Sequence, residues 1–235
     1  MVGFLLLSLL ADVTTSDLTG TVEVTRPLTR RRIAVDAYQN RAPALDGGAA
    51  LNPSNEMDSV AIYVERINGM PVGLPASTVS QEPLELRQKN RNFSRQLVIV
   101  PVGATVSFPN DDPIFHNVFS LSKAKAFDLG YFPKNQTRVV KFTKPGIVEV
   151  FCHLHANMSA TVVVAPTQYY TQPAKDGSFV LRDLPAGAEV DLVAWHRAAG
   201  FFRRRVKVPA GNVRFVLPLR ETAPEPVDAP PRTTP

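Results

Sequence analysis

Short runs of strand-forming residues, separated by turn residues, follow one another along most of this 235-residue chain. Runs of this length that are rich in β-branched and aromatic residues and bounded by Pro, Gly or Asn are typical of β-strands. They are "GTVEV" (20–24), "VAIYVER" (60–66), "RQLVIVPVGATVSFPN" (95–110), "TRVVKFTKPGIVEVFC" (137–152) and "SATVVVAP" (159–166). The first two also alternate in the manner of half-buried strands. No long amphipathic helical pattern interrupts the series, so we predict an all-β fold.

Four more strand-like runs occupy residues 177–219, and the rest of the C-terminus has a different composition. The runs are "GSFVLRDLPAG", "AEVDLVAWH", "FFRRRVKVPAG" and "NVRFVLPL". Turn residues at a spacing of about 8–12 residues favour a sandwich or a barrel. The last fifteen residues, 221–235, contain many prolines and no aromatic residue, which predicts a disordered tail.

Composition and charge narrow the class of protein. Apolar residues make up 44% of the chain and charged residues 20%, as in an ordinary folded domain. A single cysteine excludes an internal disulfide. The net charge of +5 favours acidic partners, but no RNA-binding motif, zinc-finger spacing or basic helix is present, so we predict no nucleic-acid partner.

The N-terminus, "MVGFLLLSLLA", is an apolar run of signal-peptide length and is too short to span a bilayer. It lacks the basic residue that usually precedes such a run. We predict that residues 1–16 form a signal peptide or an uncleaved N-terminal anchor, and that the protein is periplasmic or otherwise exported.

Three potential metal ligands lie within the segment "FCHLHANM" (151–158). Val148, Val150 and Cys152 share one face of a strand, which directs the thiol inward at the end of that strand. The following loop supplies His155 and Met158. Thiolate and thioether ligands suit copper, and two histidines with one cysteine and a weak axial methionine form a blue-copper site.

That ligand set requires one more histidine, and outside the segment the chain has only His116 and His196. Other interpretations remain open for single residues. An inward cysteine or methionine is often a core residue, and a zinc site or a purely structural copper site is a further alternative. His153 points away from Cys152 if the strand continues, which indicates a surface or gating residue.

The stretches "VGATVSFPNDDPIFHNVFS" and "KPGIVEVFCHLHANMSATVVV" resemble the cupredoxins, particularly plastocyanin and amicyanin. The resemblance covers residues 83–166 and implies a Greek-key β-sandwich that holds one type 1 copper ion. The ligands that it implies are His116, Cys152, His155 and Met158. It further implies that Asn117 ties the two ligand loops together near the sulfur, and that His155 is the exposed edge for electron transfer.

The segment "DGSFVLRDLPAGAEVDLVAWH" resembles a carboxypeptidase regulatory-like, or transthyretin-like (prealbumin-like), β-sandwich. In that family, strands like "GTVEV" and "VAIYVER" normally come first. We therefore expect one discontinuous sandwich made of residues 17–70 and 174–220, with the copper domain inserted into it. The alternative is two independent small β units. Trp195 and His196 end a strand here, and we expect His196 to be a core or edge residue.

The resemblance implies a blue copper protein that carries single electrons between redox partners such as a cytochrome or a dehydrogenase, with amine (methylamine) oxidation as the associated process. We identify no Ser-His-Asp set, paired catalytic carboxylates or P-loop, and therefore predict neither enzymatic activity nor a small-molecule substrate. Asp111 and Asp112 are expected to be turn formers. The alternatives are a copper chaperone, store or sensor, and a scaffold protein with a degenerate copper fold.

Basic side chains follow the first predicted ligand, and they favour an acidic redox partner. Such charges steer association at a rate that falls as salt rises. An ordinary solvated strand face is the alternative interpretation. The residues are Lys123, Lys125, Lys134, Arg138, Lys141 and Lys144.

Overall fold

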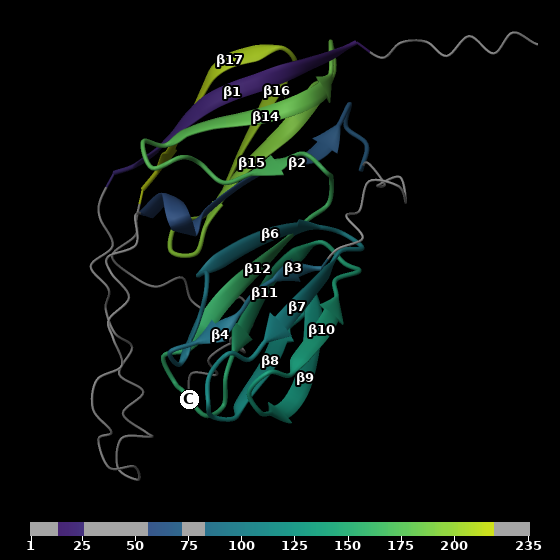
Figure 1. Ribbon diagram of the computed structural model, residues 1–235. Coiled ribbons are helices and arrows are strands. Elements are labelled where there is room, and N and C mark those ends of the chain that lie inside the picture. Colours follow the sequence, from purple (N-terminus) through teal and green to yellow (C-terminus); the bar gives the residue numbers. More distant parts are fainter. Residues whose placement is uncertain (1–13, 26–55, 72–82, 219–235) are drawn as a thin grey trace, which may run out of the picture.

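The computed structural model describes residues 14–25, 56–71 and 83–218, and these ranges are built almost entirely of β-strands (Figure 1). The helical element within them is a four-residue 3-10 turn, Glu56–Ser59. This confirms the all-β prediction. No helix in the described ranges has the length and apolarity needed to cross a lipid bilayer. The predicted tail, 221–235, lies outside the described residues.

The strands form two groups, one built from both ends of the described chain and one from its middle (Figure 1). The first group comprises β1 (Thr15–Val24), β2 (Val60–Ile67), β13 (Tyr170–Thr171), β14 (Ser178–Pro185), β15 (Glu189–His196), β16 (Gly200–Lys207) and β17 (Ala210–Leu217). The second comprises β3 (Leu84–Glu85), β4 (Gln88–Lys89), β5 (Asn92–Phe93), β6 (Leu97–Pro101), β7 (Thr105–Pro109), β8 (His116–Ser122), β9 (Lys125–Phe132), β10 (Thr137–Lys141), β11 (Gly146–Phe151) and β12 (Ser159–Ala165).

The first group contains two sheets, with strand orders β14-β1-β17 and β13-β2-β15-β16. Strand β1 runs antiparallel to β14 and parallel to β17, while β2 runs antiparallel to β15. Apolar side chains of both sheets share one core, among them Leu18, Ile62, Leu192 and Phe215. Early strands therefore pair with late strands here, although the division into domains stays a prediction. The predicted N-terminal segment, 1–16, overlaps β1 by two residues.

The second group also contains two main sheets, ordered β6-β12-β11-β8-β9 and β10-β7-β3, together with the short β4–β5 hairpin. Strand β12 pairs antiparallel with β11 and parallel with β6. The inward side chains of both sheets meet in one core, which includes Phe108, Val118, Val150 and Val162. Cys152 and Met158 belong to the same core, which places the predicted copper ligands at its edge.

A third apolar core joins the two groups of strands. Tyr63 and Trp195 from the first group pack with Ile99 and Val163 from the second. This core explains a difference from the sequence prediction. The alternation within 60–66 predicts a half-exposed strand, yet the first five residues of β2 are all buried. One face of β2 packs in the core of the first group, and the other face packs on the five-stranded sheet of the second group.

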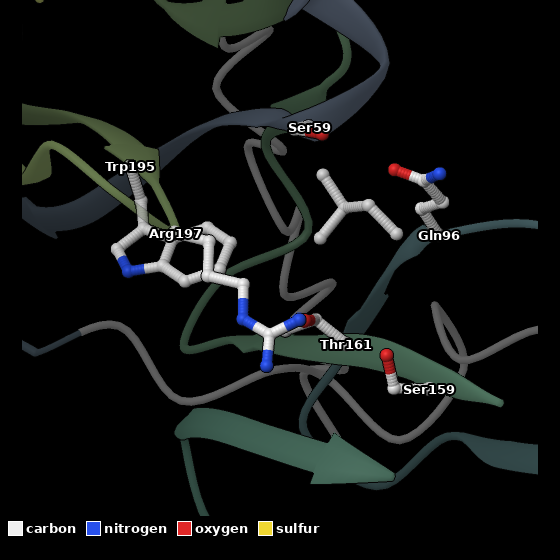
Figure 2. Close-up of a pocket in the computed structure, with 7 residues that line it drawn as sticks. Ser59, Gln96, Ser159, Thr161, Trp195 and Arg197 are labelled. Atoms are coloured by element: carbon white, nitrogen blue, oxygen red, sulfur yellow. The ribbon is translucent and has the colours of Figure 1, made fainter. Parts of the chain in front are cut away.

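A polar contact and a small cavity lie beside this third core. The Arg197 guanidinium lies 3.0 Å from a Glu149 carboxylate oxygen, and the Thr161 hydroxyl donates to the other oxygen at 3.2 Å. Burial raises the pKa of Glu149, and Arg197 opposes that rise. Figure 2 shows the cavity of about 60 Å³, which has room for a few water molecules. Its lining is Ser59, Gln96, Leu97, Ser159, Thr161, Trp195 and Arg197.

Candidate metal centre

Cys152 lies directly after the end of β11, at the edge of the apolar core. Val148 and Val150 of that strand point into the core, and Cys152 continues their face with an exposed fraction of 5%. The Cys152 N–H donates to the Met158 carbonyl at 3.3 Å, and the Met158 N–H donates to the His155 carbonyl at 2.9 Å. These backbone bonds close a compact loop that holds three of the four predicted ligands.

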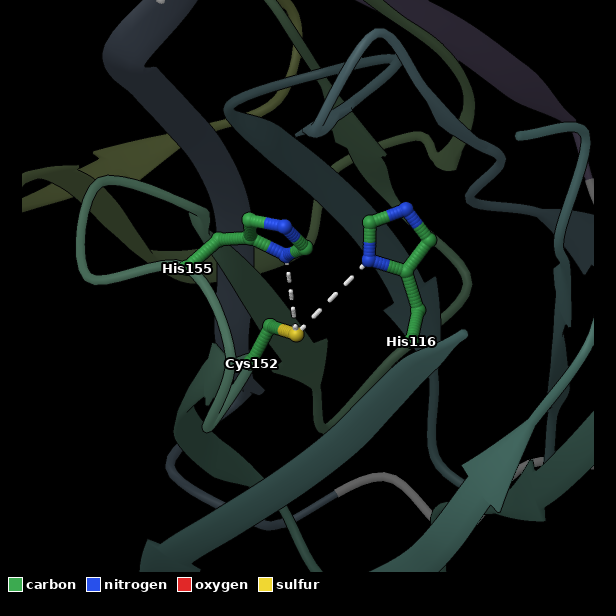
Figure 3. Close-up of side chains that lie close together, drawn as sticks. All are labelled: His116, Cys152 and His155. Carbon is green, nitrogen blue, oxygen red and sulfur yellow. Dashed lines mark hydrogen bonds between the residues drawn. The ribbon is translucent and has the colours of Figure 1, made fainter. Parts of the chain in front are cut away.

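Two imidazole nitrogens face the Cys152 sulfur from separate parts of the chain (Figure 3). The sulfur lies 3.8 Å from His116 Nδ1, on β8, and 3.7 Å from His155 Nδ1, in the loop. The three donor atoms lie within 4.8 Å of one another. A metal in a trigonal plane, with bonds of about 2.0 Å to nitrogen and about 2.3 Å to sulfur, separates sulfur from nitrogen by about 3.7 Å. A tetrahedral centre with the same bonds separates them by about 3.5 Å.

The donor chemistry and these distances fit one copper ion. Two imidazoles and one thiolate in a trigonal arrangement are the equatorial ligands of a type 1 copper site. His196, the other histidine outside the ligand segment, is buried at the end of β15 in the first group of strands and does not belong to this cluster of donor atoms.

The imidazole of His116 is fully buried and is held by a carboxylate. Its Nε2 lies 2.7 Å from Asp112 Oδ2, so Nε2–H donates to the carboxylate and the lone pair of Nδ1 faces Cys152. Such a partner fixes both the tautomer and the orientation of a metal-binding histidine. The sequence interpretation of Asp112 as a turn former is therefore incomplete, because the carboxylate also orients a predicted ligand.

Asp112 is in turn held by the β4–β5 hairpin. Its two carboxylate oxygens accept the N–H groups of Asn90, at 2.6 Å, and Arg91, at 2.8 Å. Both residues have positive φ angles, 55° and 57°, which turn their N–H groups toward the carboxylate. Burial acts to raise the pKa of Asp112, but the bonds from Arg91, His116 and Asn90 outweigh it and lower the pKa below its usual value. The carboxylate therefore stays ionised beside His116.

Asn117 connects β8 to the loop that begins at Cys152. Its side-chain oxygen accepts the His153 N–H at 3.4 Å. Its amide nitrogen donates to Asp128 Oδ1 at 2.6 Å and to the Gly130 carbonyl at 3.3 Å. Asn117 is thus placed where the resemblance predicts a residue that ties the ligand loops together.

The electrostatics at the sulfur favour a thiolate at Cys152 and a neutral imidazole at His155; at His116 burial acts to lower the pKa, but Cys152 and Asp112 raise it overall. Burial acts to raise the pKa of Cys152, but bonds from His116 and from the backbone N–H groups of Asn117 and Leu154 lower it overall. Burial lowers the pKa of His155, and the charges of His116 and Arg91 lower it further. Thiolate sulfur and neutral imidazole nitrogen are the forms in which these residues bind a metal.

The remaining residues of the segment lie in different surroundings. Met158 is 1% exposed and packs in the core that contains Cys152; its role as an axial ligand stays a prediction. His155 is partly exposed, in contrast to buried His116. The ring of His153 stacks on Phe119 at a centroid distance of 3.8 Å, and its Nε2 lies 3.7 Å from Asp128, outside the ligand group.

The apolar residues next to the ligands in the sequence are only partly enclosed. Val118 is buried in the core, and Phe151 is half-buried. Phe115 is 55% exposed and Leu154 is 50% exposed, so these two side chains belong to the protein surface.

Comparison with known proteins gives weak likenesses to copper proteins. No protein-family model and no curated protein matches the sequence. A copper-containing nitrite reductase from Thermus scotoductus is 23% identical, with a TM-score of 0.35, over 40% of this chain and 25% of the reductase. Amicyanin from Paracoccus versutus is 23% identical, with a TM-score of 0.34, over 44% of this chain and 96% of amicyanin. A purple cupredoxin from Nitrosopumilus maritimus is 23% identical, with a TM-score of 0.31, over 34% of this chain and 96% of that protein. These likenesses are too weak to assign a family or a role to this chain.

Proposed function

We propose that this protein is a type 1 copper electron carrier rather than an enzyme. The observation that supports this most directly is the approach of two imidazole nitrogens to one buried sulfur, at 3.8 and 3.7 Å. When bound by such a ligand set, copper exchanges one electron between Cu(I) and Cu(II) with little rearrangement of its ligands.

The surroundings of the ligands support transfer of an electron rather than catalysis on a substrate. His116, Cys152 and Met158 are 0%, 5% and 1% exposed, which restricts direct access to the site. His155 is partly exposed and gives the site an edge at the surface. Asp112 and Asn117 fix the two ligand-bearing segments through the hydrogen bonds described above, which keeps reorganisation on electron transfer small.

We also propose that the partner is a redox protein, such as a cytochrome or a dehydrogenase, and that the protein works in the periplasm or after export. The resemblance noted in the sequence suggests amine (methylamine) oxidation as the process. The proposed location rests on the N-terminal apolar run, of which residues 1–13 lie outside the described residues.

Visible absorption during titration with Cu(II), followed by ascorbate, tests the copper site. We expect an intense blue band that saturates at one copper per chain, bleaches on reduction and returns on reoxidation by hexacyanoferrate(III). Cys152→Ala is expected to abolish the band, because the thiolate provides the charge-transfer partner. His153→Ala is the matched control beside it and is expected to stay blue. Weak absorption in the wild type, or a blue Cys152→Ala protein, contradicts the ligand assignment.

A further inference from the structure

The positive charge of the chain is concentrated next to the first ligand. Between residues 113 and 148 there are six basic side chains and one acidic side chain, Asp128, a net charge of +5. This equals the formal net charge of the whole protein, +5, so the remaining 199 residues are neutral in sum. Asp128 already accepts hydrogen bonds from Asn117 and from the Gly130 N–H.

Three of these six basic residues lie on two strands, β9 and β10, that are both at the edge of a sheet, and the other three lie in the turns next to them. Strand β9 ends the five-stranded sheet and β10 ends the three-stranded sheet. The two strands flank each other, since the Arg138 guanidinium lies 5.9 Å from the Phe132 ring and the Phe127 ring lies 6.4 Å from that of Phe142. Figure 1 shows the same arrangement. We call four exposed residues of this region the basic edge: Lys134, Arg138, Lys141 and Lys144.

The charges of the basic edge are not neutralised by their neighbours. Within the described ranges, none of its four residues forms an ion pair with a carboxylate. On the first sandwich, in contrast, three exposed arginines are paired with carboxylates: Arg203 with Glu65, Arg205 with Asp191 and Arg214 with Glu23. An unpaired group of like charges attracts molecules of the opposite charge over about a Debye length, roughly 8–10 Å in physiological salt.

The position of the basic edge relates it to the candidate metal centre. Phe132, the last residue of β9, is paired with His116 in the β8–β9 ladder. The edge therefore begins at the end of the sandwich that carries the ligands and extends away along β10. Exposed apolar side chains lie within it: Tyr131 is 56% exposed and Val139 is 57% exposed.

We propose that the basic edge docks an acidic protein. The mixture of unpaired lysines with exposed Tyr131 and Val139 matches a protein surface, where charges steer the encounter and apolar contacts hold it. That this partner exchanges electrons rests on the proposed function, whereas the docking itself does not require copper. Lysines on edge strands also prevent strand-to-strand association, and that role alone predicts no preference of an acidic chain for the basic edge over other exposed lysines.

Binding of fluorescent poly-L-glutamate, followed by anisotropy on the full-length protein with and without copper, tests the proposal. Lys141→Glu is expected to weaken binding about five- to tenfold at low salt, because it removes one attraction and adds one repulsion. Lys144→Glu is a second variant with the same expectation. Lys207→Glu, an exposed lysine on strand β16 of the other sandwich, is the matched control and is expected to change binding less than twofold.

Each outcome decides the proposal separately from the copper assignment. Equal weakening by Lys141→Glu and Lys207→Glu, or no binding by the wild type, overturns the basic edge as a docking surface. Tighter binding of duplex DNA than of poly-L-glutamate at equal charge concentration overturns an acidic protein as its occupant. A colourless protein that still binds through Lys141 and Lys144 keeps the docking surface and removes the electron carrier.

Discussion

Two buried histidines lie next to carboxylates in different sandwiches of this molecule, and only one of them faces the Cys152 sulfur. His116 and His196 are both 0% exposed. His116 Nε2 lies 2.7 Å from Asp112, and His196 Nε2 lies 3.5 Å from Glu56. Burial beside a carboxylate therefore does not distinguish a ligand from a structural histidine.

The second ring nitrogen makes the difference. In His116 it faces the Cys152 sulfur at 3.8 Å. In His196 it accepts the Ala198 N–H at 3.2 Å, so its lone pair is already used within the turn that follows β15. A ligand histidine needs the N–H of one ring nitrogen held by an acceptor and the lone pair of the other nitrogen left for the metal. His116 meets both conditions, and His196 does not.

Replacing each histidine by alanine gives the largest expected contrast. His116→Ala removes an equatorial ligand, so the intense blue band is expected to disappear or to move to that of a different copper site. His196→Ala leaves the ligands in place and should retain the band, at a cost of about 1–3 kcal/mol in the free energy of unfolding for the buried space and the lost hydrogen bond. Absorption spectra and urea unfolding of both variants check this. A His196→Ala protein that is folded but has no blue band would contradict the assignment of His116 as a ligand and His196 as a structural residue.

The carboxylates beside the two histidines are also expected to differ: substitution of Asp112 should change copper binding, and substitution of Glu56 should not. Asp112→Asn removes the negative charge that supports His116 and one acceptor for the N–H groups of Asn90 and Arg91. Partners of this kind typically change metal affinity about 10- to 100-fold when altered. We expect Cu(II) affinity to fall by such a factor and the reduction potential to rise, because a less electron-rich imidazole stabilises Cu(II) less.

Competition with a chelator and potentiometry measure these two quantities. Glu56→Gln, beside His196, is the control and is expected to leave both unchanged. If Asp112→Asn matches the wild type in affinity and in potential while its stability falls, Asp112 acts on folding alone and does not tune the site.

The predictable part of the site is the part that is local in sequence. Cys152, His155 and Met158 fall within seven residues, and strand periodicity placed the thiol inward at the end of β11. His116 is far away in the chain, and periodicity did not choose it over His196; only the resemblance to cupredoxins did. The hydrogen-bonding environment that separates these two histidines depends on tertiary contacts.

Asp112 was missed for the same reason. Its role depends on two N–H groups of the β4–β5 hairpin, about twenty residues earlier in the chain, and no spacing rule connects them. The third core was not predicted from the sequence either. The alternating residues within β2 predict one buried face and one exposed face, and they do not show that a second sheet covers the other face. The sequence shows which strands exist, but packing between sheets decides whether the second face of a strand meets solvent or another core.

The smallest expected effect is a pH dependence that comes from His196. Burial lowers the pKa of His196 below its usual value, while Glu56 acts in the opposite direction. Between about pH 6.5 and the lower folded-state pKa, the unfolded chain binds a proton that the folded chain does not. The free energy of unfolding therefore falls as the pH falls through this window, by no more than about 1.4 kcal/mol per pH unit for this one group.

His196→Asn, whose side-chain oxygen can still accept the Ala198 N–H, removes that contribution. Urea unfolding of wild type and variant between pH 5 and 8 should show a stability difference that is constant above pH 7 and shifts in favour of the variant below 6.5. Parallel pH profiles would contradict a His196 that stays neutral in the folded protein. They would mean that His196 is protonated as readily in the folded state as in the unfolded state.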